Sequence, residues 1–267
     1  MNYTKITSQS NPKIKTVIDI RRRKSRTENV SFIIEGPHLV EMALDADASI
    51  DEVFFSEAFG SKKEGQKLLK QLSLHTTRIF EVTDGVFHKL AETETPQGII
   101  AVVTCRQLSL NQLRLKGNAL LVVSDGIQDP GNLGTIIRTA DASGADAVII
   151  LPGTCDVFMQ KTIRSTAGSV FNIPIAHASV DELVDWLRSQ KINLVVTAAD
   201  AEQSLFEVRL EKPVALVFGN EAHGAQEDLK KAADITLRIP IYGKAESLNV
   251  ASAAAACLYE AARQRSR

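Results

Sequence analysis

Five short runs of almost wholly apolar residues recur through the second half of the chain. They span residues 119–124, 147–151, 192–198, 214–219 and 235–240, and stretches of helical length separate them. A strand that is apolar on both faces has to be covered on both faces, as in a parallel sheet between two layers of helices. Because these strands alternate with helices, the sequence predicts an α/β fold built on a parallel sheet.

The first hundred residues alternate as well, but their segments are shorter. We expect a helix over residues 11–24, opened by Asn11 and Pro12, and then strands and helices in turn as far as Cys105. Residues 106–118 lack clean periodicity. The pattern predicts a small α/β domain at 1–105, a linker at 106–118 and a larger domain at 119–267.

Composition narrows the functional classes. The three cysteines are far apart and outside any C-x-x-C pair, and the five histidines lack ligand spacing, so we expect neither disulfides nor a metal site. No apolar run approaches the roughly 18–20 residues that cross a bilayer. The first fifteen residues contain no apolar core of a secretory signal. We therefore expect no membrane partner and a cytoplasmic location.

Charge is distributed unevenly along the chain. The net charge is −1, but residues 1–30 contain eight basic and two acidic side chains, which gives +6 there and −7 over the remainder. A basic arm favours a polyanionic partner such as RNA, although a solvated helix face explains the same charges equally well. The candidates for contacts with an RNA backbone are Arg21, Arg22, Arg23, Lys24 and Arg26.

The first polar loop, residues 125–145, follows directly on the first apolar run. Its Asp129-Pro130-Gly131 sequence predicts a turn, and Asn132 can cap the helix that carries Arg138. Ligands of open α/β sheets bind at the carboxyl ends of strands, where helix N-termini present free N–H groups. The glycines of this loop match neither G-x-G-x-x-G nor the G-x-x-x-x-G-K phosphate loop. An ordinary strand–turn–helix with a surface arginine is the alternative interpretation.

Two later segments also follow predicted strands. In residues 216–224, Gly219 permits close approach of backbone to a ligand, and Glu221 stands on the loop after it. In residues 239–265 a strand ends at Ile239, and a long alanine-rich helix is expected to begin near Ser247. Ser247 is then an N-cap and Asn249 a first-turn residue. Taken alone, each segment is equally compatible with an ordinary connection.

Together the segments read D-x-x-x-D-P-x-N-x-G-x-x-x-R-T-A, then G-N-E-x-x-G, then I-P-x-x-x-x-x-E-S-L-N-V. In this order they resemble the three motifs of the SpoU (TrmH-like) branch of the SPOUT methyltransferases, over about residues 119–265. Residues 161–175 also resemble the R-x-S-x-G segment of that family. The stretches ITSQSNPKIK, FIIEGPHLVEMAL and ETPQGIIAVV are similar to the substrate-binding domain that precedes many SpoU catalytic domains and itself resembles ribosomal-protein-type RNA-binding modules.

The resemblance implies a five- or six-stranded parallel sheet with a C-terminal trefoil knot, and a homodimer whose active site uses both subunits. It implies transfer of a methyl group from S-adenosylmethionine to a ribose 2′-hydroxyl of structured RNA. Ribosomal RNA is the favoured substrate; transfer RNA and antibiotic-resistance methylation of ribosomal RNA are alternatives. By position, it assigns the cofactor contacts to Thr197, Gly219, Ile239 and Leu248. It assigns the catalytic site to Asn132, Arg138, Glu221, Ser247 and Asn249.

The arginine that matches Arg138 is proposed in the family to handle the proton of the attacking hydroxyl. Because a guanidinium titrates above about pH 12, we expect Arg138 to position a phosphate or to stabilise the developing alkoxide instead. An RNA-binding assembly factor without catalysis is one alternative, but its expected loss of Arg138, Glu221 or Asn249 is not seen. The missing glycine fingerprint argues against a nucleotide-dependent oxidoreductase.

Overall fold

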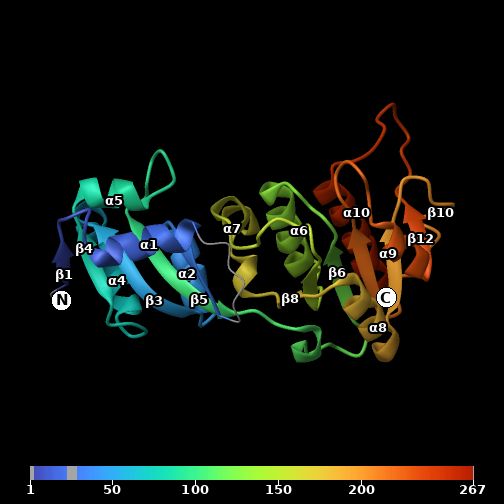
Figure 1. Ribbon diagram of the computed structural model, residues 1–267, viewed down its shortest axis with the longest axis horizontal. Coiled ribbons are helices and arrows are strands. Elements are labelled where there is room, and N and C mark those ends of the chain that lie inside the picture. The colour runs from blue at the N-terminus through green and yellow to red at the C-terminus, as the bar shows by residue number, and fades with distance from the viewer. Residues whose placement is uncertain (1–2, 23–28, 267) are drawn as a thin grey trace. The chain divides into compact units, whose positions relative to one another are not determined.

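The computed structural model describes residues 3–22 and 29–266 and divides into two compact units (Figure 1). The first unit comprises the residues up to Arg106 together with Phe158–Gln160. The second comprises Gln107–Val157 and the residues from Lys161 onward. Each unit contains its own sheet.

The first unit is a five-stranded mixed sheet with helices. Its elements are β1 (Thr4–Ile6), α1 (Pro12–Arg22), β2 (Asn29–Glu35), α2 (Pro37–Asp45), β3 (Ser49–Ser56), α3 (Glu57–Gly60), α4 (Lys63–Leu72), β4 (Ile79–Val82), α5 (Asp84–Leu90) and β5 (Ile99–Arg106). The strand order is β1-β4-β3-β5-β2, and β5 runs antiparallel to both of its neighbours. The helix α1 opens as predicted, because the Asn11 side chain accepts a hydrogen bond from the Lys13 N–H at 2.9 Å. The three-residue strand β1 was not predicted.

The second unit is a seven-stranded sheet in which every pairing is parallel. Its elements are β6 (Leu120–Ser124), α6 (Pro130–Ala142), β7 (Ala147–Ile150), α7 (Gln160–Thr166), β8 (Ile175–His177), α8 (Val180–Gln190), β9 (Asn193–Thr197), β10 (Gln203–Ser204), β11 (Val214–Phe218), α9 (Glu227–Ala232), β12 (Ile235–Arg238) and α10 (Val250–Arg265). The order is β10-β12-β9-β11-β6-β7-β8. The parallel sheet is confirmed, and the five predicted strands form its centre. The two unpredicted strands, β8 and β10, are short and occupy its edges.

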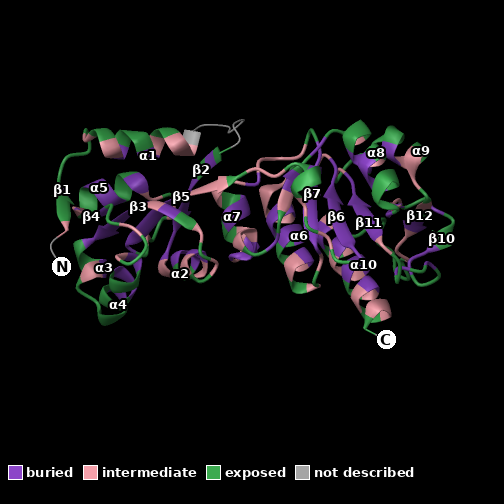
Figure 2. Cartoon of the chain, turned by 90° about the horizontal axis from the view of Figure 1, so that it is seen from below, coloured by how far each residue is buried: buried purple, intermediate pink, exposed green. Residues whose placement is uncertain are grey.

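Helices cover both faces of this second sheet, as its apolar strands require. Figure 2 shows the buried central strands with α8 and α9 on one side and α6 and α10 on the other. On the first side, Leu183, Trp186 and Leu229 pack against the strands. Leu110 belongs to this same core, with Leu113 packed against it, so part of the predicted linker 106–118 is integral to the second unit.

The strand order explains where the predicted motifs meet. β12, β9, β11 and β6 are successive neighbours and all run in the same direction, so their carboxyl ends share one edge of the sheet. Three of the loops that begin at this edge belong to the three motifs, namely residues 125–129, 219–226 and 239–249. The trefoil knot stays a prediction. No described helix is both long and apolar enough to cross a bilayer.

Candidate active site

The turn between β6 and α6 leaves the Asn132 side chain free for other contacts. Asp129 is the N-cap of α6, and its carboxylate accepts a hydrogen bond from the Asn132 N–H at 2.9 Å, with Pro130 as the first helical residue. The prediction that Asn132 caps this helix was therefore wrong. The Lys161 ammonium lies 2.6 Å from Asp129 and, together with the Asn132 N–H, lowers the pKa of that carboxyl.

Three of the five predicted catalytic residues form one hydrogen-bonded network. The Glu221 carboxylate accepts a hydrogen bond from the Asn132 Nδ2 at 3.0 Å. It also accepts the backbone N–H groups of Gln128 at 3.0 Å and Asp129 at 3.2 Å. The Asn132 Oδ1 accepts a hydrogen bond from the Asn249 Nδ2 at 3.0 Å. Side chains from all three motifs are thus joined at the same edge of the sheet.

Asn249 also begins the last helix. Its Oδ1 accepts hydrogen bonds from the N–H groups of Ala251 at 2.9 Å and Ser252 at 3.4 Å, which makes it the N-cap of α10. The expectation that this helix begins near Ser247 was wrong by three residues. Ser247 is exposed in the loop before the helix and has no hydrogen bond within the described parts of the chain.

Arg138 lies apart from this network, two turns along α6. Its side chain is exposed and forms no ion pair or hydrogen bond with any residue that the structure describes. Residues seven apart lie on one face of a helix, so Arg138 shares a face with Gly131 at the start of α6. An exposed cation without a partner is available to an anionic ligand such as a phosphate.

The hydrogen bonds decide the ionisation state of Glu221. Partial burial by itself raises the pKa of its carboxyl, but the donors on Asn132, Gln128 and Asp129 outweigh that effect and the pKa is lowered. Glu221 is therefore ionised at neutral pH and is a weak base. Nearby, burial raises the pKa of the Cys155 thiol to about 11, helped by the negative charge of Glu221, so this thiol stays protonated at neutral pH.

Three polar residues that were not predicted as site residues hold the Glu221 loop in place. Asp125 is 1% exposed, and its carboxylate accepts hydrogen bonds from the backbone N–H of Gln226 at 2.7 Å and from the Gln226 side-chain amide. The Asn220 Nδ2 donates to the carbonyl of Gly126 at 2.8 Å. Asp125 and Asn220 stand inside the quoted motifs and could have been singled out there, whereas nothing in the sequence marks Gln226.

The predicted cofactor residues lie at adjacent strand ends. Thr197 ends β9, Gly219 follows β11 and Ile239 follows β12, and these three strands are neighbours. The Thr197 hydroxyl donates to the carbonyl of Val217 at 2.8 Å. A Cβ on Gly219 would lie 2.1 Å from the backbone nitrogen of Ala225, so the fold itself requires glycine at this position.

The loop after β12 exposes an unusual amount of apolar surface. Leu248 is 42% exposed, Ile241 37% and Tyr242 88%, and all three lie between β12 and α10. Ligand sites are lined mainly by apolar side chains with a few polar groups that fix orientation. The loop after β12 therefore leaves apolar side chains open to a ligand. The described residues contain no group of three or more metal-ligating side chains.

Of the five side chains predicted to contact RNA, the structure describes only that of Arg21. The Arg21 side chain is 18% exposed, lies 3.3 Å from Glu92 and donates to the carbonyl of Leu90, so it is engaged within its own unit. Arg22 ends α1, and its side chain lies outside the described part of the chain. Arg23, Lys24 and Arg26 are themselves outside the described residues.

Comparison with protein families matches both units. Residues 119–259 match the SpoU rRNA Methylase family, and residues 11–101 match the MRM3-like substrate binding domain. The chain is 38% identical to the 23S rRNA (guanosine(2553)-2′-O)-methyltransferase RlmP of Bacillus subtilis, over 95% of this chain and 97% of that protein. It is 31% identical to the 23S rRNA (uridine(2479)-2′-O)-methyltransferase of Streptomyces viridochromogenes, over 91% of this chain and 86% of that protein.

Solved structures agree with these relatives. The AdoMet-bound rRNA methyltransferase from Sinorhizobium meliloti superposes with a TM-score of 0.87 at 33% identity, over 98% of both chains. The SpoU methyltransferase AviRb from Streptomyces viridochromogenes, in complex with AdoMet, gives a TM-score of 0.86 at 29% identity, over 96% of this chain and 98% of that one. Family, relatives and structures point the same way, and the chain belongs to the SpoU rRNA methylase family.

Proposed function

We propose that this chain transfers the methyl group of S-adenosylmethionine to a ribose 2′-hydroxyl of large-subunit ribosomal RNA. The observation that carries the proposal is the network that joins Glu221, Asn132 and Asn249 at the carboxyl edge of the parallel sheet. The relatives named as 23S rRNA 2′-O-methyltransferases support the substrate class, because they match nearly the whole chain.

Transfer RNA is the second candidate substrate, and chain coverage argues against it. The structure described as concerning 2-OH methylation of C/U34 on tRNA covers only 57% of this chain, although 99% of its own chain is matched. It gives a TM-score of 0.51 at 28% identity. The rRNA relatives, in contrast, extend through the first unit. Ribosomal RNA is therefore the better candidate substrate, because the rRNA relatives match the first unit as well as the second.

The cofactor supplies an electrophilic methyl group on a sulfonium, when bound. Gly219, Ile239 and Leu248 would hold it at the strand ends, with Thr197 beside them. Because that methyl group is already electrophilic, we propose that the reaction needs no metal ion. Chelation with EDTA is expected to leave the rate of methylation unchanged.

The ribose hydroxyl is a poor nucleophile at neutral pH and has to lose its proton as it attacks. Glu221 is a weak base because its hydrogen bonds lower its pKa, so we assign it to orientation of Asn132 and of the turn before α6. Arg138 remains charged and places a backbone phosphate or stabilises the developing alkoxide, while the proton of the hydroxyl passes to solvent water. With Ser247 and Asn249 orienting the ribose, most of the rate gain comes from positioning and electrostatics.

We also propose that the chain acts as a homodimer in the cytoplasm. The last helix offers a surface for a second copy, because Tyr259 is 56% exposed among half-buried alanines of α10. Light scattering of the purified protein is expected to give twice the mass of one chain.

The test of function uses radiolabelled S-adenosylmethionine and total RNA from cells that lack the gene. We expect label at one alkali-resistant linkage of large-subunit rRNA, since 2′-O-methylation blocks alkaline cleavage at that position. Arg138→Ala should abolish labelling and leave cofactor affinity nearly unchanged. Arg188→Ala, an exposed arginine of α8, is the matched control and should retain full activity. Cofactor binding without label in any RNA, naked or in ribosomal particles, would contradict the proposal.

A further inference from the structure

Within the first unit, the basic side chains that follow residue 29 gather on one helix. Between residues 29 and 106 the chain has seven lysines and arginines, and four of them, Lys62, Lys63, Lys67 and Lys70, stand on α4 or directly before it. The same range contains twelve aspartates and glutamates, of which α4 carries only Glu64. Positive charge is thus concentrated on one element of an otherwise acidic stretch.

Several other cations of the first unit are paired with carboxylates. Lys5 lies 2.8 Å from Glu81, Lys13 lies 3.0 Å from Glu52, and Arg78 also pairs with Glu52. Lys62 and the three lysines of α4 are all exposed, and none forms an ion pair with a residue in the described ranges. Their charge is therefore not used within the first unit.

The spacing along α4 aligns three of these charges. Lys63, Lys67 and Lys70 are four and then three residues apart, so they lie on one face, opposite the buried leucines of this helix. Like charges at this spacing destabilise a helix by a few tenths of a kcal/mol per pair. An anionic partner with repeated charges, such as an RNA backbone, relieves that repulsion.

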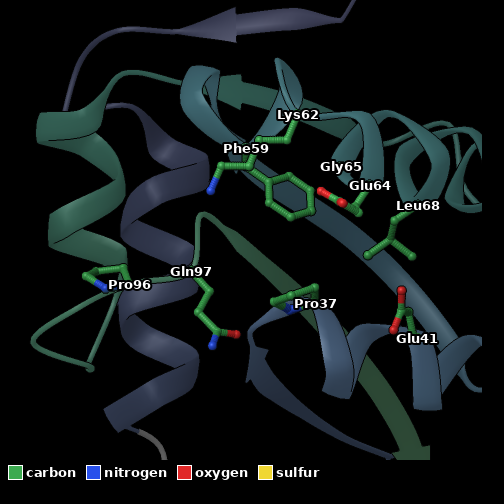
Figure 3. A pocket seen from close by; sticks show the side chains of 9 residues that line it. All are labelled: Pro37, Glu41, Phe59, Lys62, Glu64, Gly65, Leu68, Pro96 and Gln97. Carbon is green, nitrogen blue, oxygen red and sulfur yellow. The ribbon is translucent and has the colours of Figure 1, made fainter.

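A cavity of about 500 Å³ adjoins the same helix. Figure 3 shows Phe59, Leu68 and Pro37 on its walls, with Gln97 and the carboxylate of Glu41 reaching the space from two sides. Its volume lies in the usual range of small-ligand sites. Apolar walls suit the faces of a nucleobase, and a carboxylate accepts hydrogen bonds from the amino or imino N–H of its edge.

We propose that α4 and this cavity form an RNA-binding surface of the first unit. Lys63, Lys67 and Lys70 contact phosphates on the outer face of α4. The strand then passes the start of the helix at Lys62, which lines the cavity, and the cavity receives one unstacked base whose N–H donates to Glu41. Phosphate contacts supply affinity without sequence preference, and the base contact supplies selectivity. The inference rests on the proposed function, because it takes the substrate of the active site to be RNA.

The phosphate contacts are tested by Lys63→Gln/Lys67→Gln/Lys70→Gln in the full-length protein. We expect the salt dependence of binding to an rRNA transcript to weaken, with the slope of log K against log salt reduced by about 2, since each contact contributes about 0.7–0.9. KM for RNA should rise while kcat and cofactor affinity stay unchanged. The control, Lys89→Gln/Lys191→Gln/Lys212→Gln, removes the same charge from exposed positions outside the surface and outside the basic arm. A slope equal to that of the control would overturn the phosphate contacts.

The base contact is tested by the sign of the effect of Glu41→Leu, which removes both the charge and the hydrogen-bond acceptor. Removing a negative charge near a polyanion tightens binding if the charge only repels. If Glu41 accepts a hydrogen bond from a base, its loss should weaken binding about tenfold. Unchanged or tighter binding would overturn the cavity as a base site.

Failure of this inference is distinguishable from failure of the proposed function. If the wild-type protein methylates rRNA and the α4 variant behaves as its control does, only the RNA surface is wrong. If the wild-type protein labels no RNA, the proposed function fails, whatever the variants bind.

Discussion

At the scale of single residues, Asn132 is the centre of the site because it uses both ends of its amide. Its Nδ2 donates to Glu221, which as a carboxylate can only accept, and its Oδ1 accepts from Asn249. No charged side chain offers a donor and an acceptor in this geometry. The sequence suggested Asn132 as a helix cap, since local capping patterns do not distinguish a cap from a residue three positions later.

Asn132→Asp should lower kcat by about 10- to 100-fold, because it replaces the donor with a second carboxylate against Glu221 and removes a positioning contact. Steady-state methylation of an rRNA transcript measures the effect. Asn172→Asp is the matched control: its Nδ2 lies 3.4 Å from the carboxylate of Asp141, so it creates a similar repulsion at a place with no proposed role. Equal losses in both variants would mean that Asn132 acts only through stability.

The pH dependence of stability should report the environment of Glu221. Its pKa in the folded state lies below the ordinary 4.5, because hydrogen bonds outweigh the opposing effect of burial. The stabilisation is therefore present above about pH 4.5 and is lost as the pH falls through the folded-state pKa. We expect Glu221→Gln to lower the unfolding free energy at pH 7 and to approach the wild type below pH 4.5. Urea unfolding across this range measures it, and the same substitution at exposed Glu211 is the control for the loss of a carboxylate.

At the scale of elements, the motif glycines have packing roles that their spacing did not reveal. A Cβ on Gly134 would lie 2.5 Å from both the Cβ of Ser165 and the carbonyl oxygen of Thr162, so this glycine allows α6 to approach α7. Gly219 is constrained in the same way by the backbone at Ala225. The sequence predicted Gly219 as a ligand contact, and contacts between residues distant along the chain are not visible in a local pattern.

Gly219→Ala should reduce the unfolding free energy by about 1–3 kcal/mol, because backbone atoms of the 219–226 loop have to move to admit the methyl group. Denaturant unfolding of the full-length protein measures this loss. The control is Gly117→Ala, where a Cβ would meet no atom within 4 Å and where a gain of about 0.4–1 kcal/mol is expected from a stiffer unfolded chain. A neutral Gly219→Ala would show that the loop rearranges without cost.

The major elements were predictable because apolar runs of strand length persist along the sequence. The five central strands of the second unit came from such runs, whereas β8 and β10, with three and two residues, are too short to show periodicity. The predicted N-caps were misplaced, by three residues at Asn132 and by two at Ser247, because several polar residues in each loop were equally suitable caps. The element types were therefore easier to predict than their first residues.

At the scale of the whole molecule, the sequence predicted a smaller domain followed along the chain by an α/β parallel-sheet domain, and the structure contains two compact units. The three motifs meet because β12, β9, β11 and β6 are neighbours, and that strand order does not follow from the order of the motifs along the chain. From the sequence, only the resemblance to a family indicated that the three motifs form one site. The knot and the homodimer remain predictions for the same reason, since both depend on long-range arrangement.

Cofactor binding should stabilise the second unit selectively, because the proposed cofactor residues all lie there. At a concentration 100 times its Kd, S-adenosylmethionine should add about 2.7 kcal/mol to the unfolding free energy of that unit. Hydrogen exchange of the full-length protein can follow the two sheets separately. Protection is expected to rise in β9, β11 and β12 and to stay constant in β2 and β3. Equal gains in both sheets would contradict a site confined to the second unit.

Asn249 caps α10 with its oxygen and reaches Asn132 with its nitrogen. Aspartate and serine cap helices about as well as asparagine, but neither supplies that donor in the same place. Variants such as Asn249→Asp can therefore keep their melting temperature while losing the link between the first and third motifs. A search for damaging substitutions that sorts variants by thermal stability or by expression level would pass them as harmless. Only an assay of methyl transfer itself would detect them.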